Sequence, residues 1–239
     1  MKKLGVIGGL GPLATSHFFE LVVRMTDASC DQEHMDMVIY NYPSIPDRTN
    51  YILQKSNENP FPKMLEVAKR LHKEEVDYIV VPCITAHYFY QDLQQRVETP
   101  IINMVQETVD YLYQRKIKKV GIMATEGTIQ SRIVQEIVEK AGMELVVPSE
   151  EKEKELMDLI YKEVKANKPI DMYKFESITK YLQEKGAEVI ILGCTELSVV
   201  KREITVGPGF IDALEVLALR SIKLCGYPVR REYEELITV

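Results

Sequence analysis

The 239-residue sequence contains no tryptophan, few cysteines and no run of about 18 apolar residues, so no membrane-spanning helix is expected. It also lacks an excess of basic residues, since the formal net charge is -6. This charge argues against the basic surface that nucleic-acid binding requires. The four cysteines show neither CxxC pairs nor the spacing of zinc ligands. We therefore expect free thiols, no bound metal, no nucleic-acid partner and a cytoplasmic location.

A glycine-rich segment near the N-terminus matches two known patterns only in part. The opening residues MKKLGVIGGLGPLAT superficially resemble a signal peptide, but glycines interrupt the apolar stretch and no A-x-A cleavage site follows. Residues 9–14 also match the G-x-G-x-x-A pattern of dinucleotide sites. The next predicted strand, however, ends at Asn41 rather than in the acidic residue that holds a ribose. We interpret the segment as a strand entering a turn and a helix start, which can bind any anion, including a carboxylate.

Short apolar runs alternate with amphipathic stretches along the chain, which predicts an α/β fold. Continuous apolar character is typical of strands that are buried on both faces of a parallel sheet. The predicted strands are LGVIGG, MVIYN, YIVVPC, PIINM, VGIMAT, LVVPS and VIILGC. The predicted helices include PKMLEVAKRLHKEE, YKFESITKYLQEKG and a C-terminal apolar helix, GFIDALEVLALRSIKLC.

An internal repeat indicates two similar lobes. KKLGVIGGLGPLATS, beginning at Lys2, resembles KKVGIMATEGTIQSR, beginning at Lys118. LHKEEVDYIVVPC and LQEKGAEVIILGC also resemble each other and end in Cys83 and Cys194. We predict two pseudo-twofold-related lobes, each a parallel-rich sheet flanked by helices, with the active site in the cleft between them. The first lobe would comprise residues 1–99 plus 207–239, and the second residues 100–206.

The two cysteines at equivalent points of the repeat suggest acid–base chemistry. Each follows a buried strand, and ligands of open α/β sheets bind at such strand ends. A thiol near a helix N-terminus has a pKa below about 8.5. Removing a proton from one face of a carbon atom and returning one to the other face requires a thiolate base and a thiol acid. Hydrogen-bond donors must also stabilise the developing enolate, and Thr85, Thr125 and Thr195 are the candidates.

Several motifs resemble the aspartate racemase branch of the aspartate/glutamate racemase family. They occur in order over nearly the whole chain: GLGPLAT, DQEH, PSIPDRT, PCITAHYF, ATEGT and GCTELS. The resemblance implies a two-lobed α/β fold, a homodimer, and racemisation of an amino acid without pyridoxal phosphate or any other cofactor. It places the catalytic pair on Cys83 and Cys194. It also implies a substrate-binding arginine at Arg48 and a second cation at Lys165.

Together the two cations would select a substrate that carries a second carboxylate, because a guanidinium can hold a carboxylate through two hydrogen bonds. Asp47 and Glu196 are candidates for tuning Cys83 and Cys194. The departure that matters most is Ile84, which stands where the family usually has asparagine, and Leu10 in place of the frequent methionine is a milder one. Losing that amide removes a polar contact worth on the order of 1 kcal/mol or more if it is buried.

Aspartate is the first substrate we expect, and several alternatives stay open. Ile84 leaves room for glutamate or another amino acid as the substrate. A decarboxylase or a cis–trans isomerase of dicarboxylates can use a single cysteine. A catalytically weak binding protein for acidic metabolites would bind a ligand without exchanging its Cα–H proton.

Overall fold

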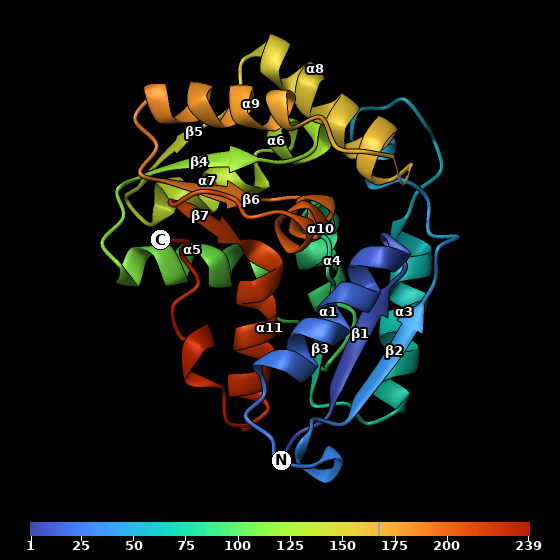
Figure 1. The fold of residues 1–239 in the computed structure, drawn as a ribbon. Helices are drawn as coiled ribbons and strands as arrows, with labels where there is room; N and C mark the ends of the chain where they lie inside the picture. Colours follow the sequence, from blue (N-terminus) through green and yellow to red (C-terminus); the bar gives the residue numbers. More distant parts are fainter. Residues whose placement is uncertain (167) are drawn as a thin grey trace.

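The computed structural model describes residues 1–166 and 168–239 and shows two α/β lobes, each built on one sheet (Figure 1). The first sheet has the strand order β2–β1–β3, and the second has the order β5–β4–β6–β7. All strand pairs in these two sheets are parallel, which confirms the predicted α/β class. The strands are β1 (Leu4–Gly8), β2 (Met37–Asn41), β3 (Tyr78–Val80), β4 (Lys119–Met123), β5 (Glu144–Val146), β6 (Val189–Leu192) and β7 (Phe210–Asp212).

Helices cover the sheet of the first lobe (Figure 1). The clearest amphipathic helix is α3, whose apolar side chains recur every three or four residues and are buried on one face. The helical segments of this lobe are α1 (Pro12–Met25), η1 (Asp31–Glu33), α2 (Arg48–Ile52), α3 (Phe61–Lys73), η2 (Thr85–Phe89) and α4 (Tyr90–Gln94).

The second lobe has helices on both faces of its sheet, with α8 and α9 on the outer face in Figure 1. Across the part of the chain described here, every helix is too short or too polar to cross a bilayer. The helical segments are α5 (Met104–Gln114), α6 (Glu126–Gln130), α7 (Ile133–Lys140), α8 (Glu150–Asp158), the π-helical turn η3 (Leu159–Val164), α9 (Met172–Glu184) and α10 (Thr195–Glu203).

The C-terminal segment differs from the single helix that the sequence suggested. Its first apolar residues form β7, which pairs with β6, and the helix α11 begins only at Ala213 and ends at Leu224. The Asp212 carboxylate accepts a hydrogen bond from the Leu214 backbone N–H at 2.8 Å and so caps the start of α11. A short 3-10 turn, η4 (Arg231–Tyr233), follows.

The sequence predicted that residues 207–239 belong to the first lobe. They contribute β7 to the second sheet, and α11 contacts both α1 and α5 (Figure 1). The prediction of a strand at PIINM was wrong: Ile101 makes one bridge to Ile79, and α5 begins soon afterwards at Met104. The Asn103 side chain caps that helix start, which ends the extended segment.

The two lobes share an apolar core and also meet where α2 packs against α6. One buried cluster includes Leu4 of the first sheet and Val120 of the second. Between the two helices, a Cβ atom added to Gly127 would lie 2.9 Å from the Thr49 Cα, so only glycine permits this approach. These contacts hold the two short helices face to face at the boundary of the lobes.

Candidate active site

Cys83 and Cys194 lie at corresponding positions of the two lobes and line the same cavity. Cys83 lies between β3 and η2, whereas Cys194 is the N-cap residue of α10, just after β6. Each residue is 7% exposed. The structure therefore brings one buried thiol from each lobe to a single space between the lobes.

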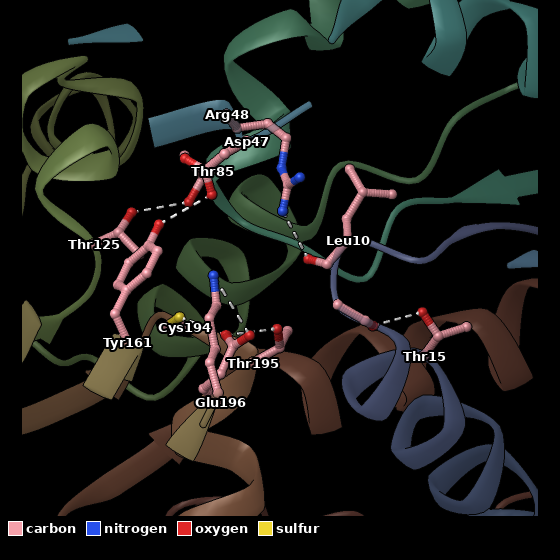
Figure 2. Close-up of polar contacts among 12 residues, drawn as sticks. Leu10, Thr15, Asp47, Arg48, Thr85, Thr125, Tyr161, Cys194, Thr195 and Glu196 are labelled. Carbon is pink, nitrogen blue, oxygen red and sulfur yellow. Dashed lines mark hydrogen bonds and ion pairs between the residues drawn. The ribbon is translucent and has the colours of Figure 1, made fainter. Parts of the chain in front are cut away.

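A chain of charged contacts surrounds Cys194 (Figure 2). Its Sγ donates a hydrogen bond to Glu196 Oε2 at 2.9 Å. The other oxygen of this carboxylate, Oε1, lies 3.8 Å from Lys165 Nζ. The ammonium group of Lys165 also lies 4.0 Å from the centre of the Tyr161 ring. Glu196 thus connects the thiol to the predicted second cation.

The surroundings of Cys194 favour the neutral thiol. Burial and then the Glu196 carboxylate raise the pKa of Cys194 well above its usual value. The prediction that a helix start lowers this pKa was wrong, because burial and a nearby negative charge outweigh the effect of Lys165. Burial opposes the charge on Lys165, but Glu196 and Cys194 raise its pKa overall, so Lys165 is a cation at neutral pH.

Arg48 places a buried positive charge on the other side of the cavity. Its terminal nitrogens donate to backbone carbonyls: Nη1 to Pro46 at 3.0 Å and Ile45 at 3.4 Å, and Nη2 to Leu10 at 3.2 Å (Figure 2). Its Nε is buried and has no hydrogen-bond partner among residues 1–166 and 168–239. Burial opposes the guanidinium charge, but the neighbouring Cys83 contributes to a net rise in the pKa of Arg48.

Asp47, a candidate for tuning Cys83, makes hydrogen bonds to two other residues. Its Oδ1 accepts a hydrogen bond from the Asn50 N–H at 2.8 Å and caps α2. Its Oδ2 accepts one from the Tyr161 hydroxyl at 3.2 Å, which joins the two lobes. Sequence reasoning did not assign Tyr161 to the site. It lies four residues before Lys165, and this helical spacing was the available signal.

Three threonine hydroxyls form a triangle beside the cavity. The Thr85 Oγ1 lies 3.0 Å from that of Thr125 and 2.9 Å from that of Thr128, and the last two are 3.1 Å apart. Thr85 and Thr125 were predicted site residues, whereas Thr128 was missed. Thr128 could have been found from the helix cap of α6, because a threonine at the N-cap position bonds the backbone three residues later. Here the Thr128 N–H donates to the Thr125 Oγ1 at 3.3 Å. The fourth hydroxyl, on Thr195, lies 3.5 Å from Glu196 Oε2.

The glycine-rich turn shapes the wall of the cavity. Gly9 has φ of +92°, and a Cβ there would lie 2.4 Å from the Tyr42 backbone, so no other residue fits without movement. The Thr15 hydroxyl accepts a hydrogen bond from the Gly9 N–H and donates one to the Gly11 carbonyl, both at 2.9 Å. This internal bonding holds the intervening Leu10 carbonyl against Arg48 (Figure 2).

His87 supports the segment around Cys83 through the backbone. Its Nε2 accepts a hydrogen bond from the Met104 N–H at 3.0 Å, so Nδ1 carries the proton and donates to the Cys83 carbonyl at 2.9 Å. Burial lowers the pKa of His87, in keeping with a neutral ring. The side chain therefore fixes the strand end to the start of α5.

The cavity that both thiols line has a volume of about 10 Å³, which is close to that of a single water site. A larger cavity lies beside it. Ile84 is 3% exposed and contributes an apolar side chain to the wall of the smaller cavity. The inner cavity in this structure is therefore too small to hold an amino acid. In the described parts of the chain, His, Cys, Asp and Glu side chains form no group of three or more suited to a metal ion.

The two α/β lobes each contribute one thiol to a shared cavity. Comparisons with known proteins identify the class to which this protein belongs. The model of the Asp/Glu/hydantoin racemase family matches residues 7–220. The chain belongs to this family, and its enzyme class is that of the racemases.

The individual matches agree with this assignment. The chain is 29% identical over 227 residues to the broad specificity amino-acid racemase RacX of Bacillus subtilis, covering 92% of this chain and 96% of the relative. The structure of Picrophilus torridus aspartate racemase has a TM-score of 0.85 and 30% identity, covering 98% of each chain. Francisella tularensis glutamate racemase, in complex with D-glutamate, is similar in fold, with a TM-score of 0.66 and 19% identity over 93% of this chain and 80% of that one.

Proposed function

We propose that this protein racemises an amino acid, with aspartate as the first candidate substrate, by acid–base catalysis at Cys83 and Cys194 without a cofactor. The observation that carries the proposal is the single closed cavity lined by one thiol from each lobe. Breaking a Cα–H bond on one face and forming it again on the other requires an acid and a base on opposite sides of the carbon.

The two thiols have different surroundings in this mechanism. Cys83, beside the Arg48 guanidinium, acts as the base in its thiolate form and takes the α-proton, so an S–H bond forms as the C–H bond breaks. Cys194, kept protonated by burial and Glu196, gives its proton to the opposite face of the carbanion. The product leaves the enzyme with Cys83 protonated and Cys194 as the thiolate, which is the state that accepts the other enantiomer.

Hydrogen-bond donors near the thiols stabilise the charge that develops on the α-carboxylate. The backbone N–H groups at the start of α10 and the hydroxyls of Thr85, Thr125, Thr128 and Thr195 serve this role. For aspartate, the unpartnered Nε of Arg48 donates to the side-chain carboxylate and Lys165 adds a second positive charge.

Replacing Arg48 by alanine is then expected to raise the KM for aspartate far more than the KM for alanine. Equal changes would remove Arg48 from side-chain recognition.

A second candidate is a racemase for glutamate or a wider range of amino acids. Ile84 supports it, because an apolar side chain stands in the cavity wall where the resemblance implies an amide. The name of the Bacillus subtilis relative also describes broad specificity.

The experiment that tests the proposal incubates the purified protein with L- and D-amino acids in deuterated water and measures α-deuterium by mass spectrometry. We expect deuterium in both enantiomers of at least one amino acid, with the activity unchanged by dialysis against a chelator. Ligand binding without any α-deuterium would instead indicate a binding protein. The cytoplasmic location expected from the sequence and the homodimer implied by the resemblance belong to the same proposal, and light scattering would determine the oligomeric state.

A further inference from the structure

A second cavity of about 640 Å³ lies directly outside the cavity of the two thiols. Asp47, Arg48, Lys165 and Glu196 line both cavities and so form a shared wall. The outer volume falls in the range of pockets that bind small molecules, whereas the inner one holds about one water. A molecule whose reacting carbon lies between the thiols would therefore extend past this wall into the outer cavity.

Beyond the shared wall, most of the lining of the outer cavity is apolar. It comes from three separate parts of the fold: the start of α1, the loop after β2, and the facing segments η3 and α10 of the second lobe. The apolar side chains are Pro12, Leu13, Ala14, Pro43, Ile45, Val164 and Val199. Leu13 is 48% exposed, so this large apolar side chain is open to contact by a ligand.

The shared wall has no excess of positive charge that would restrict the site to acidic side chains. Its two cations are matched by two carboxylates, and Lys165 Nζ already lies 3.8 Å from Glu196 Oε1. The terminal nitrogens of Arg48 make three hydrogen bonds to backbone carbonyls, so the Nε–H and one N–H of Nη2 are not used by these backbone bonds. A side chain without a carboxylate can pass this wall without leaving the two cations unpaired.

We propose that the outer cavity is a side-chain subsite for amino acids with apolar side chains larger than that of aspartate, such as leucine, methionine and phenylalanine. The inference rests on the proposed two-thiol function, which places the α-carbon in the inner cavity. The apolar side chain then contacts Leu13, Val164 and Val199 once the lobes have separated to admit the substrate. Burial of each additional methylene group favours the larger substrate.

The test compares α-deuterium exchange of leucine, phenylalanine, alanine and aspartate under identical conditions. We expect kcat/KM for leucine to exceed that for alanine by about tenfold, because the extra carbon atoms enter the outer cavity. Leu13→Trp, at an exposed helix position, fills part of the cavity and should lower the leucine-to-alanine ratio by about fivefold or more. Phe19→Trp is the matched control: it lies on the same helix, is 45% exposed and is outside the cavity lining, so the ratio should not change.

The outcomes separate this inference from the proposed function. If aspartate exchanges its α-proton but leucine and phenylalanine do not, the subsite proposal is overturned and the two-thiol mechanism is unaffected. A Leu13→Trp protein that loses leucine and alanine exchange equally, with an unchanged circular dichroism melting curve, would also overturn the subsite. Val199→Phe provides a second variant from the opposite lobe and should lower the same ratio. Absence of exchange with every amino acid would overturn the proposed function itself.

Discussion

Cys83 and Cys194 occupy equivalent places in a repeated fold, yet their surroundings are electrically opposite. Cys83 lies beside the buried guanidinium of Arg48, while the thiol of Cys194 donates to the Glu196 carboxylate at 2.9 Å. Pseudo-twofold symmetry therefore applies to the backbone but not to the charges. Under the proposed mechanism, this difference would place a base on one face of the substrate carbon and an acid on the other.

The largest effect is expected from removing either sulfur. Cys83→Ser and Cys194→Ser should each lower the racemisation rate by about a thousandfold or more, because a serine hydroxyl is a poor acid and base at neutral pH. Circular dichroism at a fixed wavelength follows the interconversion of the enantiomers. Cys30→Ser is the matched control, since Cys30 is an exposed free cysteine outside the cavity. Substantial racemisation in either active-site variant would show that the two sulfurs do not act as a pair.

A smaller effect that sharpens the contrast is expected at Glu196. Glu196→Gln removes the negative charge that helps burial to raise the pKa of Cys194, so this pKa should fall. Alkylation of Cys194 by iodoacetamide should then begin at lower pH than in the wild type, and racemisation should slow about tenfold as the resting acid is lost.

Lys165→Met should raise the pKa of Cys194, because the Lys165 ammonium group lowers it in the wild type. Alkylation of Cys194 should then begin at higher pH. Shifts in the same direction for both variants would contradict the assigned charges.

The Cys83 side of the comparison is tested at Arg48. Arg48→Met removes the cation beside this thiol, and iodoacetamide should alkylate Cys83 about tenfold more slowly at neutral pH. Peptide mass spectrometry separates the rates at the two cysteines within one sample. Arg48→Lys retains a positive charge and should restore part of the rate. An alkylation rate at Cys83 that does not depend on residue 48 would remove Arg48 as its electrostatic partner.

The smallest effect is expected from an ion pair at the surface between the lobes. Lys55 Nζ lies 2.9 Å from Glu126 Oε2, and the lysine side chain is 57% exposed. Solvent screening limits such a pair to roughly 0.2–1 kcal/mol. Lys55→Ala should therefore change the free energy of unfolding by less than about 1 kcal/mol and kcat/KM by less than about threefold. A larger loss would mean that lobe closure depends on the surface rather than on the buried contacts.

The sequence predicted the features that depend on repetition and on apolar patterning. Two parallel sheets follow from continuous apolar strands, and the repeat placed Cys83 and Cys194 at matching strand ends before any contact was known. The strand β7 was missed because a three-residue strand directly before a helix, with only two apolar residues, has no periodicity of its own.

Contacts between distant segments were the least predictable part of the site. The bond between Tyr161 and Asp47, and the place of Thr128 beside Thr85, depend on how the two lobes meet. The pKa of Cys194 was predicted in the wrong direction, since the helix start was evident from the sequence but the burial and the position of the Glu196 carboxylate were not.

The most direct test incubates the two single cysteine variants with each enantiomer in deuterated water and measures α-deuterium in substrate that has not been inverted. If one thiol serves each face, Cys83→Ser and Cys194→Ser should each exchange the α-proton of one enantiomer without inverting it. The two variants should act on opposite enantiomers. Exchange of the same enantiomer by both variants would contradict an arrangement in which the substrate carbon lies between the two sulfurs.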